Sequence, residues 1–469
     1  MKVFRATKII ATLGPASRSE EGIASLIDAG ANLFRLNFAH ETRELHAKTI
    51  SLVKRIAKER GATIGVLADI AGPKIRLGEL PDGEAHILPG QFVSLSDKPA
   101  EPKVWPVQLL EFAKYVSVGD PIYLDDGTKR LRVEEIDDNI VRCRVEVGGT
   151  VVSRKGMNLP NLRRALPVVS NKDIEDARAA LEAGADWLAL SFVSDARDAE
   201  PLRHLMQEMG VERPLLAKLE RPAALENLSA ILDAFDGVMV ARGDLGIEIE
   251  FEKVPAVQTE IIRAAIRAAK PVVVATQMLE SMVHSPRPTR AEVTDIAYAI
   301  EGGADAVMLS EETAIGENPA EAVRVMAKVA LATEALRLAS EMLHLVDSET
   351  SDIEAAIGAA AAHLAHDTSA RAILCPTTSG AAVRTVDRFR PHVPIVAVSN
   401  NAAVVGHLTL LSGVLPFYRT LTQDTDERIR TAEQTALEEG VVCSDDVVVE
   451  VGGYPTGKGN ANLVRVRRL

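Results

Sequence analysis

A phrase of one design occurs three times in the chain and predicts a repeated strand–helix unit. It reads DAGANLFRLNF at 28–38, EAGADWLALSF at 182–192 and EGGADAVMLSE at 301–311. In each copy a helical segment ends, a glycine follows, and an apolar strand begins. The glycines suit the left-handed position that ends many helices, and they are Gly30, Gly184 and Gly303. The strands are apolar on both faces, which is typical of a buried parallel sheet built from βα units.

Five more apolar runs lie between these phrases and bring the number of expected strands to eight. They lie at 7–14, 64–70, 214–220, 237–244 and 271–278. Most of the eight runs are followed by a segment with helical periodicity. Eight βα units predict an α/β fold with a closed (β/α)8, or TIM, barrel, for which ~250 residues are typical. An open doubly wound sheet is the alternative, and the number of units favours the barrel.

The alternation is interrupted after the third strand. Short strand-like runs and turn residues fill 71–167, which predicts a small β-barrel domain inserted in a barrel loop as a lid. After about residue 345, helices and strands alternate again as in an open α/β domain. We therefore predict a barrel at 1–70 and 168–345, a lid at 71–167, and a C-terminal α/β domain at 346–469.

Composition excludes several classes of protein. The formal net charge of −13 argues against a surface that coats nucleic acid. Three cysteines without a CxxC pair support neither a zinc knuckle nor a disulfide framework, and they fit a reducing compartment. The N-terminal segment is too interrupted for a signal peptide, and no apolar run approaches the ~20 residues that span a bilayer. We expect a cytoplasmic protein with neither nucleic-acid nor membrane partners.

Polar residues gather where the expected barrel strands end, which is where barrel enzymes place their catalytic groups. The set comprises Arg35, Asn37, Asp69, Ser191, Lys218, Glu220, Arg242 to Asp244, Thr276, and Ser310 to Glu312. The set is mixed in charge. A barrel with a purely structural role would have little reason to end so many strands with polar residues.

Lys218 and Glu220 lie two residues apart on one expected strand, so their side chains share a face. Asp244 ends the next strand. Carboxylates on adjacent strands could bind a divalent cation such as Mg²⁺, and a neighbouring lysine would neutralise charge on a bound anion. Taken alone, the lysine and glutamate are better interpreted as an interior ion pair. The additional acidic residue favours a metal site.

Longer motifs now resemble one family, the pyruvate kinases, over nearly the whole chain. They are TKIIATLGPASRS, RLNF, GPKIR, KGMNLP, SFV, KLE, VMVARGDLG, ATQMLESM, PRPTRAEVTD and the MLS and ETA of MLSEETA, in the family's order. The resemblance implies a glycolytic enzyme that transfers the phosphoryl group of phosphoenolpyruvate to ADP and yields pyruvate and ATP. It also implies a homotetramer with a C-terminal effector domain.

The resemblance implies a role for each matching residue. Glu220 and Asp244 would hold Mg²⁺ (or Mn²⁺), while Lys218 and Arg35 would contact the phosphoryl group. Gly243 and Asp244 would receive the substrate carboxylate at a helix start, and Thr276 would lie where the enolate is protonated. The residues that would face the nucleotide phosphates are Asn37, His40, Arg76 and Lys155.

The chain departs from the family pattern at the site of a monovalent cation. In potassium-dependent members this site uses residues that correspond to Asn37, Ala39 and Asp69, and the backbone of the residue that corresponds to Ile70. Ala39 replaces a serine and Ile70 replaces a threonine, and Lys74 stands where those members have a glutamate. The chain has lost one oxygen ligand and gained a fixed cation. We therefore predict that K⁺ is not required, the alternative being that Lys74 points to solvent while Asn37 and Asp69 still bind K⁺.

The segment TTSGAAVR at 377–384 predicts a strand-to-helix turn that can hold phosphate. In the family this turn holds a phosphorylated effector, which here would contact Thr377, Thr378, Ser379 and Gly380. The partner loop at 452–462 offers Lys458. An alternative is that the turn has lost its ligand.

Two other functions stay open. Another barrel enzyme of pyruvate chemistry, such as an aldolase or lyase, would share the two carboxylates but would not need the lid, Arg76 or Lys155. A metabolite-sensing scaffold without activity would not need Lys218 or the metal ligands, all of which are present.

Overall fold

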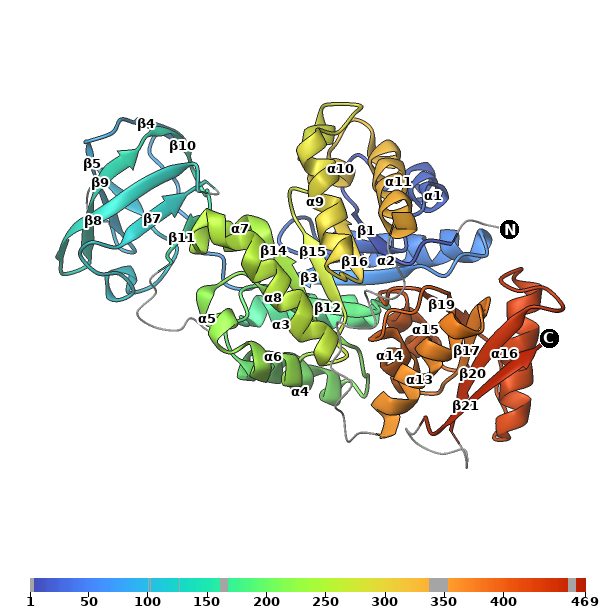
Figure 1. Ribbon diagram of the computed structural model, residues 1–469. Coiled ribbons are helices and arrows are strands. Elements are labelled where there is room, and N and C mark those ends of the chain that lie inside the picture. Colours follow the sequence, from blue (N-terminus) through green and yellow to red (C-terminus); the bar gives the residue numbers. More distant parts are fainter. Residues whose placement is uncertain are drawn as a thin grey trace.

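The computed structural model describes residues 4–99, 101, 103–125, 127–160, 168–336, 353–453 and 461–469. These residues form a closed barrel, a smaller β unit that projects from it, and a C-terminal α/β unit (Figure 1). The predicted fold class is confirmed. The exact domain boundaries stay a prediction, and the boundary expected at 345/346 lies outside the described residues.

Eight parallel strands close the barrel in the order β1-β16-β15-β14-β13-β12-β3-β2. They are β1 (Lys8–Thr12), β2 (Leu33–Asn37), β3 (Gly65–Ile70), β12 (Trp187–Leu190), β13 (Leu215–Leu219), β14 (Gly237–Ala241), β15 (Val272–Ala275) and β16 (Ala306–Leu309). Nearly every residue in them is buried, because one face fills the barrel and the other packs against helices. All eight strands expected from the sequence are present.

Helices surround the barrel. They are α1 (Glu20–Ala29), α2 (Arg43–Glu59), α3 (Asn171–Glu182), α4 (Glu200–Glu208), α5 (Pro222–Glu226), α6 (Leu228–Ala234), α7 (Arg242–Glu248), α8 (Val254–Arg267), α9 (Arg290–Glu301), α10 (Glu311–Ala314) and α11 (Pro319–Leu336), with short 3₁₀ turns η2 (Ala196–Ala199), η3 (Phe251–Lys253) and η4 (Glu280–Val283). The three repeated glycines have positive φ, namely 111° at Gly30, 93° at Gly184 and 100° at Gly303, as predicted.

Two strands end earlier than the sequence suggested. β13 ends at Leu219, so Glu220 follows the strand. β14 ends at Ala241, and Arg242 already belongs to α7, with Asp244 in its first turn. An acidic side chain is favourable there, because the N-terminus of a helix carries partial positive charge.

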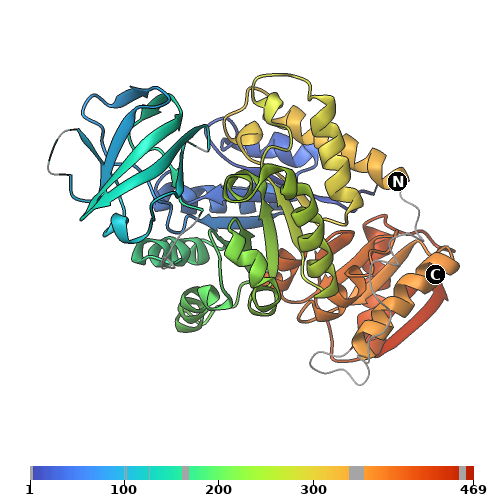
Figure 2. The same ribbon diagram turned by 60° about the vertical axis from the view of Figure 1, so that its left-hand side comes forward.

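The inserted unit has two sheets, β11-β7-β8-β9-β5-β6 and β10-β4, and its own apolar core. Its elements are β4 (Glu84–Ile87), β5 (Phe92–Ser96), β6 (Val104–Pro106), η1 (Phe112–Lys114), β7 (Pro121–Leu124), β8 (Lys129–Asp137), β9 (Ile140–Val147), β10 (Gly149–Val152) and β11 (Met157–Asn158). Figures 1 and 2 show it standing out from the barrel, far from the C-terminal unit.

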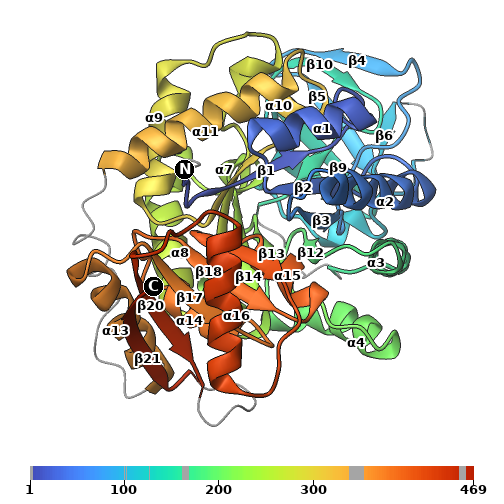
Figure 3. The ribbon, with the colours of Figure 1, turned by 90° about the vertical axis from the view of Figure 1, so that its right-hand side faces the viewer.

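The C-terminal unit is an open sheet in the order β19-β18-β17-β20-β21, in which only β21 runs antiparallel to its neighbour. Its elements are α13 (Ile353–Asp367), β17 (Ala372–Pro376), α14 (Ala381–Asp387), β18 (Ile395–Ser399), α15 (Ala402–Leu408), β19 (Val414–Tyr418), α16 (Thr425–Glu438), β20 (Val447–Gly452) and β21 (Leu463–Arg468). Figure 3 shows this unit packed beside the barrel.

The C-terminal unit covers the end at which the barrel strands begin. The Nζ of Lys8, the first residue of β1, donates to the carbonyl oxygen of Val414 at 2.6 Å. The indole Nε1 of Trp187, the first residue of β12, donates to the carbonyl oxygen of His407 at 3.1 Å. The opposite end of the barrel, where the strands finish, is therefore left for the inserted unit. None of the described helices combines the length and apolarity needed to cross a bilayer.

Candidate active site

Three polar residues at the ends of neighbouring strands surround the ammonium group of Lys218. Its Nζ lies 2.9 Å from Oε1 of Glu220 and 3.5 Å from Oδ1 of Asp69, and it donates to Oγ of Ser191 at 2.8 Å. Burial lowers the pKa of Lys218, but Asp69 and Glu220 outweigh that effect and the net direction is upward. Lys218 is therefore held as a cation where the barrel strands end.

Glu220 is buried and repelled by a second carboxylate. Its Oε2 accepts the backbone N–H of Phe192 at 2.8 Å. Burial raises the pKa of Glu220 to about 7, with Lys218 opposing the rise and Asp244 adding to it. Asp244 is half-buried in the first turn of α7. A cation between Glu220 and Asp244 would relieve both burial and repulsion.

The donor set fits Mg²⁺. Among the described residues, no three histidine, cysteine, aspartate or glutamate side chains form a closed metal site. Two carboxylates alone suit a hard cation that takes its remaining ligands from water and substrate oxygens, which is how proteins commonly hold Mg²⁺. Glu220 and Asp244 are the residues that would hold it.

Arg35 on β2 adds a second cation beside this cluster. Its Nε lies 2.7 Å from Oδ2 of Asp69, and its Nη1 donates to Oγ1 of Thr12 at 3.2 Å. Burial alone would raise the pKa of Asp69, but Lys218 and Arg35 outweigh it and lower that pKa. Lys218 and Arg35 thus both contact Asp69, and a bound anion at this edge would meet two cations.

The loop after β15 is tied to the start of α7. The backbone N–H of Gly243 donates to Oγ1 of Thr276 at 2.7 Å. Thr276 has a φ of 70°, a left-handed conformation that costs about 1–3 kcal/mol in a residue other than glycine. Such a conformation persists where the surroundings fix it, so the position of the Thr276 hydroxyl is closely defined.

An ion pair between Arg242 and Asp295 supports this loop, and neither residue has a specific role that could be predicted from the sequence. The Arg242 guanidinium donates to the carbonyl oxygen of Thr276 at 2.6 Å and contacts the carboxylate of Asp295 at 2.6 Å. Asp295 is the last residue of PRPTRAEVTD. The motif was the available signal, but the contact joins α9 to α7 and is invisible in the sequence.

Glu312, which also had no specific predicted role, joins the loops after β15 and β16. Its carboxylate accepts the backbone N–H of Leu279 at 3.0 Å and of Ser310 at 2.6 Å. Its neighbour Glu311 is exposed to solvent.

The residues expected at a monovalent-cation site are largely engaged with other groups. The Oδ1 of Asn37 accepts the backbone N–H of Ala39 at 3.1 Å. Both oxygens of Asp69 face the cations described above. Ile70 is fully buried, and its backbone carbonyl oxygen already accepts the N–H of Ser191 at 3.3 Å. The set therefore provides few oxygen atoms that could replace the water around K⁺.

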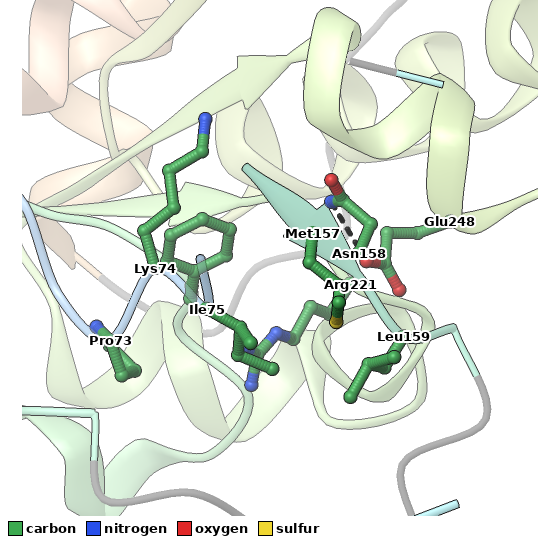
Figure 4. A pocket seen from close by; sticks show the side chains of 9 residues that line it. Pro73, Lys74, Ile75, Met157, Asn158, Leu159, Arg221 and Glu248 are labelled. Atoms are coloured by element: carbon green, nitrogen blue, oxygen red, sulfur yellow. Dashed lines mark hydrogen bonds between the residues drawn. The ribbon is translucent and has the colours of Figure 1, made fainter. Parts of the chain in front are cut away.

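Lys74 lies on the segment that leads from the barrel into the inserted unit. It is half-buried, and a Cβ added at Gly156 would lie 2.9 Å from its Cε, so its stem crosses the lid close to the backbone. Figure 4 shows the ammonium group pointing away from Arg221 and from the hydrogen bond between Asn158 and Glu248 (3.1 Å). The side chain of Lys74 is thus one wall of a small pocket at the base of the lid, whose other lining residues include Arg221, Asn158 and Glu248.

Arg76 and Lys155, expected at the nucleotide phosphates, lie together on the inserted unit. Arg76 forms a β-bridge with Gly156, the residue after Lys155. The Nζ of Lys155 lies 2.7 Å from Oδ1 of Asp125, and the Lys155 side chain is 45% exposed. Both residues are placed where the lid meets the chain from the barrel.

The pKa of His40 shows which positive charges lie near it. Partial burial lowers the pKa of His40, and then Arg76, Arg35 and Lys74 lower it further. Arg76, Arg35 and Lys74 therefore lie near enough to His40 for their positive charges to act on its imidazole. Because the chain carries a net charge of −13, such a concentration of positive charge is a local feature suited to phosphate groups.

The turn expected to hold an effector lies at the end of β17. Gly380 has a φ of 80°, and its N–H donates to Oγ1 of Thr377 at 2.8 Å. Thr378 and Ser379 are exposed. Within the partner loop at 452–462, residues 454–460, and with them Lys458, lie outside the described residues.

Two family profiles match the chain. "Pyruvate kinase, barrel domain" matches residues 4–323, and "Pyruvate kinase, alpha/beta domain" matches residues 355–467. The first match spans more than half of the chain, and together they cover both the barrel and the C-terminal unit.

Comparison with individual proteins points to the same family as the two profiles. A protein named pyruvate kinase from Staphylococcus epidermidis is 39% identical over 99% of this chain and 80% of its own length. One named pyruvate kinase 2 from Synechocystis is 41% identical over 98% of this chain and 79% of its own. A crystal structure of a pyruvate kinase from Cryptosporidium parvum superposes with a TM-score of 0.93, at 34% identity, and covers 99% of this chain and 96% of that one.

Proposed function

This chain belongs to the pyruvate kinase family of phosphotransferases, and from that premise we propose the reaction, cofactor and residue roles that follow. The enzyme transfers the phosphoryl group of phosphoenolpyruvate to ADP and yields pyruvate and ATP. The observation that carries this proposal is the charged Lys218 beside Glu220 and Asp244 at the end of a closed barrel. We also place the reaction in cytoplasmic glycolysis.

Phosphoryl transfer needs positioning and charge neutralisation more than covalent chemistry. The bond between the enol oxygen and phosphorus breaks, and a bond from phosphorus to the terminal phosphate oxygen of ADP forms. Lys218 and Arg35 lie on two different strands, and both contact Asp69. From these positions both supply positive charge to the phosphoryl group during its transfer. Lys218 also stabilises the enolate oxygen that is left behind.

Glu220 and Asp244 would hold Mg²⁺ (or Mn²⁺), which supplies a Lewis acid for the substrate oxygens. The start of α7 receives the substrate carboxylate, because backbone N–H groups and the helix dipole favour an anion there. Gly243 lies in that first turn, and its N–H already contacts Thr276.

The enolate then takes a proton at its terminal carbon and becomes the ketone pyruvate. Thr276 lies at the site of this step, held by Gly243 and by the Arg242–Asp295 brace. We propose that its hydroxyl orients the water that delivers the proton. The inserted unit closes over the site as a lid, which excludes water that would otherwise hydrolyse the phosphoryl group.

In this proposal the phosphates of ADP face four residues, namely Arg76, Lys155, Asn37 and His40. The support is the positive charge around His40 and the position of Arg76 and Lys155 on the lid. Closure of the lid would bring the Lys155 ammonium toward the nucleotide, together with Asp125, which lies on the same unit.

We propose that the enzyme does not require K⁺. Asp69 already contacts two cations, the Oδ1 of Asn37 accepts the N–H of Ala39, and the carbonyl oxygen of Ile70 accepts the N–H of Ser191. Lys74 would supply the positive charge that K⁺ provides in potassium-dependent relatives. Activity measured in tetramethylammonium chloride and in KCl tests this, and a large stimulation by K⁺ would refute it.

For the C-terminal unit we propose a phosphorylated effector on the turn Thr377, Thr378, Ser379 and Gly380, within a homotetramer. The hydrogen bond from Gly380 to Thr377 shapes the turn. Thermal-shift measurements with fructose 1,6-bisphosphate and the mass from light scattering test the two statements separately.

The catalytic proposal is tested by a coupled assay for pyruvate. Wild-type protein with phosphoenolpyruvate, ADP and MgCl₂ is expected to produce pyruvate. Lys218→Met should lose most of this activity while remaining folded, because methionine retains the length of the side chain and removes the charge. No pyruvate from the wild type at saturating Mg²⁺ would refute the proposal.

A further inference from the structure

The chain between β2 and α2 presents two of the residues proposed to face the phosphates of ADP, Asn37 and His40. Asn37 ends β2, and His40 lies in the loop of residues 38–42 that leads to α2. Residues 39–42 are exposed. Glu41 has a φ of 67°, which is uncommon in a residue other than glycine. Such a loop needs an anchor if it is to hold its polar groups in one geometry for a ligand.

The ring of His46, near the start of α2, contacts this loop at two points. Its Nε2 lies 2.8 Å from the carbonyl oxygen of His40. Its face stacks on the ring of Phe38, with 4.2 Å between the ring centroids and 25° between the planes. One side chain on the helix therefore fixes the main chain of the loop at His40 and a side chain of the loop at Phe38.

His46 occupies a position where an apolar side chain is expected. Ile50, Val53 and Ala57 follow it along α2 at intervals of three or four residues, and all are buried on the side of the helix that faces the barrel (Figure 3). Only 7% of His46 is exposed. A buried polar ring costs free energy unless it is hydrogen-bonded. The hydrogen bond that offsets this cost joins the helix to the loop at His40.

The ring of His46 is neutral and acts as a hydrogen-bond donor. Burial lowers the pKa of His46, and the opposing effects of the His40 backbone, Glu41, Asp176 and the Asn37 backbone do not reverse that direction. A neutral imidazole has one N–H, and a carbonyl oxygen can only accept, so Nε2 carries the hydrogen. The ring thus interacts with the backbone of both Asn37 and His40.

Other contacts of this part of the loop are local or exposed. The backbone N–H of His40 donates to the carbonyl oxygen of Asn37 at 3.2 Å, within the same turn. Arg18 pairs with Glu41 at 2.6 Å, but both side chains are about one-third exposed, and such ion pairs contribute little. His46 supplies a buried link between the loop and α2.

We propose that His46 is a positioning residue for the nucleotide. Through the His40 carbonyl group and the Phe38 ring, it fixes the loop so that Asn37 and His40 meet the phosphates of ADP. This inference rests on the proposed function, in which those two residues face ADP. His46 contacts the loop and not the nucleotide, so its loss acts on ADP and leaves phosphoenolpyruvate and the divalent cation unaffected.

The test measures the affinity of the full-length protein for ADP in MgCl₂ by isothermal titration calorimetry. His46→Leu fills the buried position and removes the donor, and we expect the affinity for ADP to fall at least about tenfold because the loop is no longer held in place. His46→Gln keeps an N–H donor on a side chain of similar reach and should restore most of the affinity. Thr49→Val is the matched control, because the buried Thr49 hydroxyl donates to Leu45 within α2 and should not affect ADP.

Thermal melting separates positioning from a purely structural role. His46→Leu should melt at the wild-type temperature or above, because it adds apolar surface at a buried position and the freed carbonyl group of the exposed His40 can bind water. The KM for phosphoenolpyruvate and the affinity for Mn²⁺ should stay within about twofold of the wild type. A structural role would instead lower the melting temperature and weaken all three ligands together.

An affinity for ADP within about twofold of the wild type in His46→Leu would overturn the proposal, even where the wild type makes pyruvate. Equal losses in His46→Leu and His46→Gln would also overturn it. His46→Met removes the donor with a more adaptable side chain, and it replaces His46→Leu in the comparison if leucine prevents folding. Binding of ADP that depends on His46 in a protein that makes no pyruvate would support this inference and refute the proposed reaction.

Discussion

The Lys218 ammonium lies 2.9 Å from a carboxylate oxygen of Glu220, and both residues are buried, with 9% of Lys218 and 1% of Glu220 exposed. A buried ion pair of this kind is weak evidence of stability, because desolvation offsets most of the attraction. Its position where the strands end, beside Asp69 and Asp244, makes a catalytic role the better explanation.

Glu220→Gln keeps the shape of the side chain and removes its charge. We expect the affinity for Mn²⁺, measured by electron paramagnetic resonance, to fall by at least about 10- to 100-fold. Turnover should fall by at least about 100-fold, since the cation no longer neutralises the substrate. Glu450→Gln is the control, because Glu450 is a buried carboxylate on β20 far from the site. Unchanged Mn²⁺ affinity in Glu220→Gln would contradict the metal assignment.

Asp295→Asn weakens the brace on the loop after β15. The Arg242 guanidinium loses a charged partner, so the carbonyl and hydroxyl of Thr276 are less firmly placed. We expect kcat to fall by about 10-fold or more while the KM for ADP stays similar, because the brace acts at the enolate end of the substrate. Steady-state kinetics with each substrate varied would show this. A change confined to the KM for ADP would argue against the role.

Lys74→Glu should convert the enzyme to one that K⁺ stimulates. The substitution removes the fixed cation, and a bound K⁺ could then restore positive charge near Asp69 and Asn37. We expect low activity in tetramethylammonium chloride and at least partial recovery in KCl, with little response to K⁺ in the wild type. Lys172→Glu, at an exposed lysine on α3, is the control for added negative charge. Equal activity of Lys74→Glu in both salts would count against the substitution of lysine for K⁺.

The contact between the barrel and the C-terminal unit contains a buried arginine with two carboxylates. Arg390 contacts Asp305 at 2.6 Å and Asp387 at 2.8 Å. Asp305 also accepts the N–H of Val272 and of Ser412. Asp305→Asn should therefore lower the free energy of unfolding by about 3–5 kcal/mol, measured by urea denaturation, because it leaves a buried charge without its main partner.

Asp387→Asn is expected to behave differently. Burial raises the pKa of Asp387 to about 8, and Arg390 opposes the rise while Asp305 adds to it. A carboxyl whose pKa is raised in the folded state stabilises the fold below its unfolded pKa of about 4, and that stabilisation is lost as the pH rises toward 8. Asp387→Asn cannot ionise, so its stability should decline less than that of the wild type between pH 5 and pH 8. An identical decline in both proteins would show that Asp387 does not titrate there.

The barrel was predictable because its signals are local. The glycines after the helices have positive φ at all three repeats, and the apolar strands are buried on both faces. Several strands of the inserted unit were not foreseen, such as β11 (Met157–Asn158), which has two residues. β21 was missed because LVRVRR carries three arginines on an exposed edge. Such short or polar strands form only because a neighbouring strand supplies the hydrogen bonds.

In the site, too, some features could be predicted from the sequence and others depend on the fold. Lys218, Glu220 and Asp244 could be selected from the sequence, because chemistry and strand position coincide in them. The contact of Lys218 with Ser191, and of Arg242 with Asp295, joins segments far apart in the chain and depends on barrel closure. No sequence motif predicts the cavity of about 470 Å³ between the barrel and the C-terminal unit, because it forms only where the two units pack together.

The central claim is transfer of a phosphoryl group to ADP by the Lys218 site, and ³¹P nuclear magnetic resonance tests it most directly. In a mixture of phosphoenolpyruvate, ADP and MgCl₂, the wild type should replace the phosphoenolpyruvate resonance with the γ-phosphate of ATP, one for one with pyruvate. Lys218→Met should leave the spectrum nearly unchanged. Accumulation of inorganic phosphate in place of ATP, or no change with the wild type, would contradict the account.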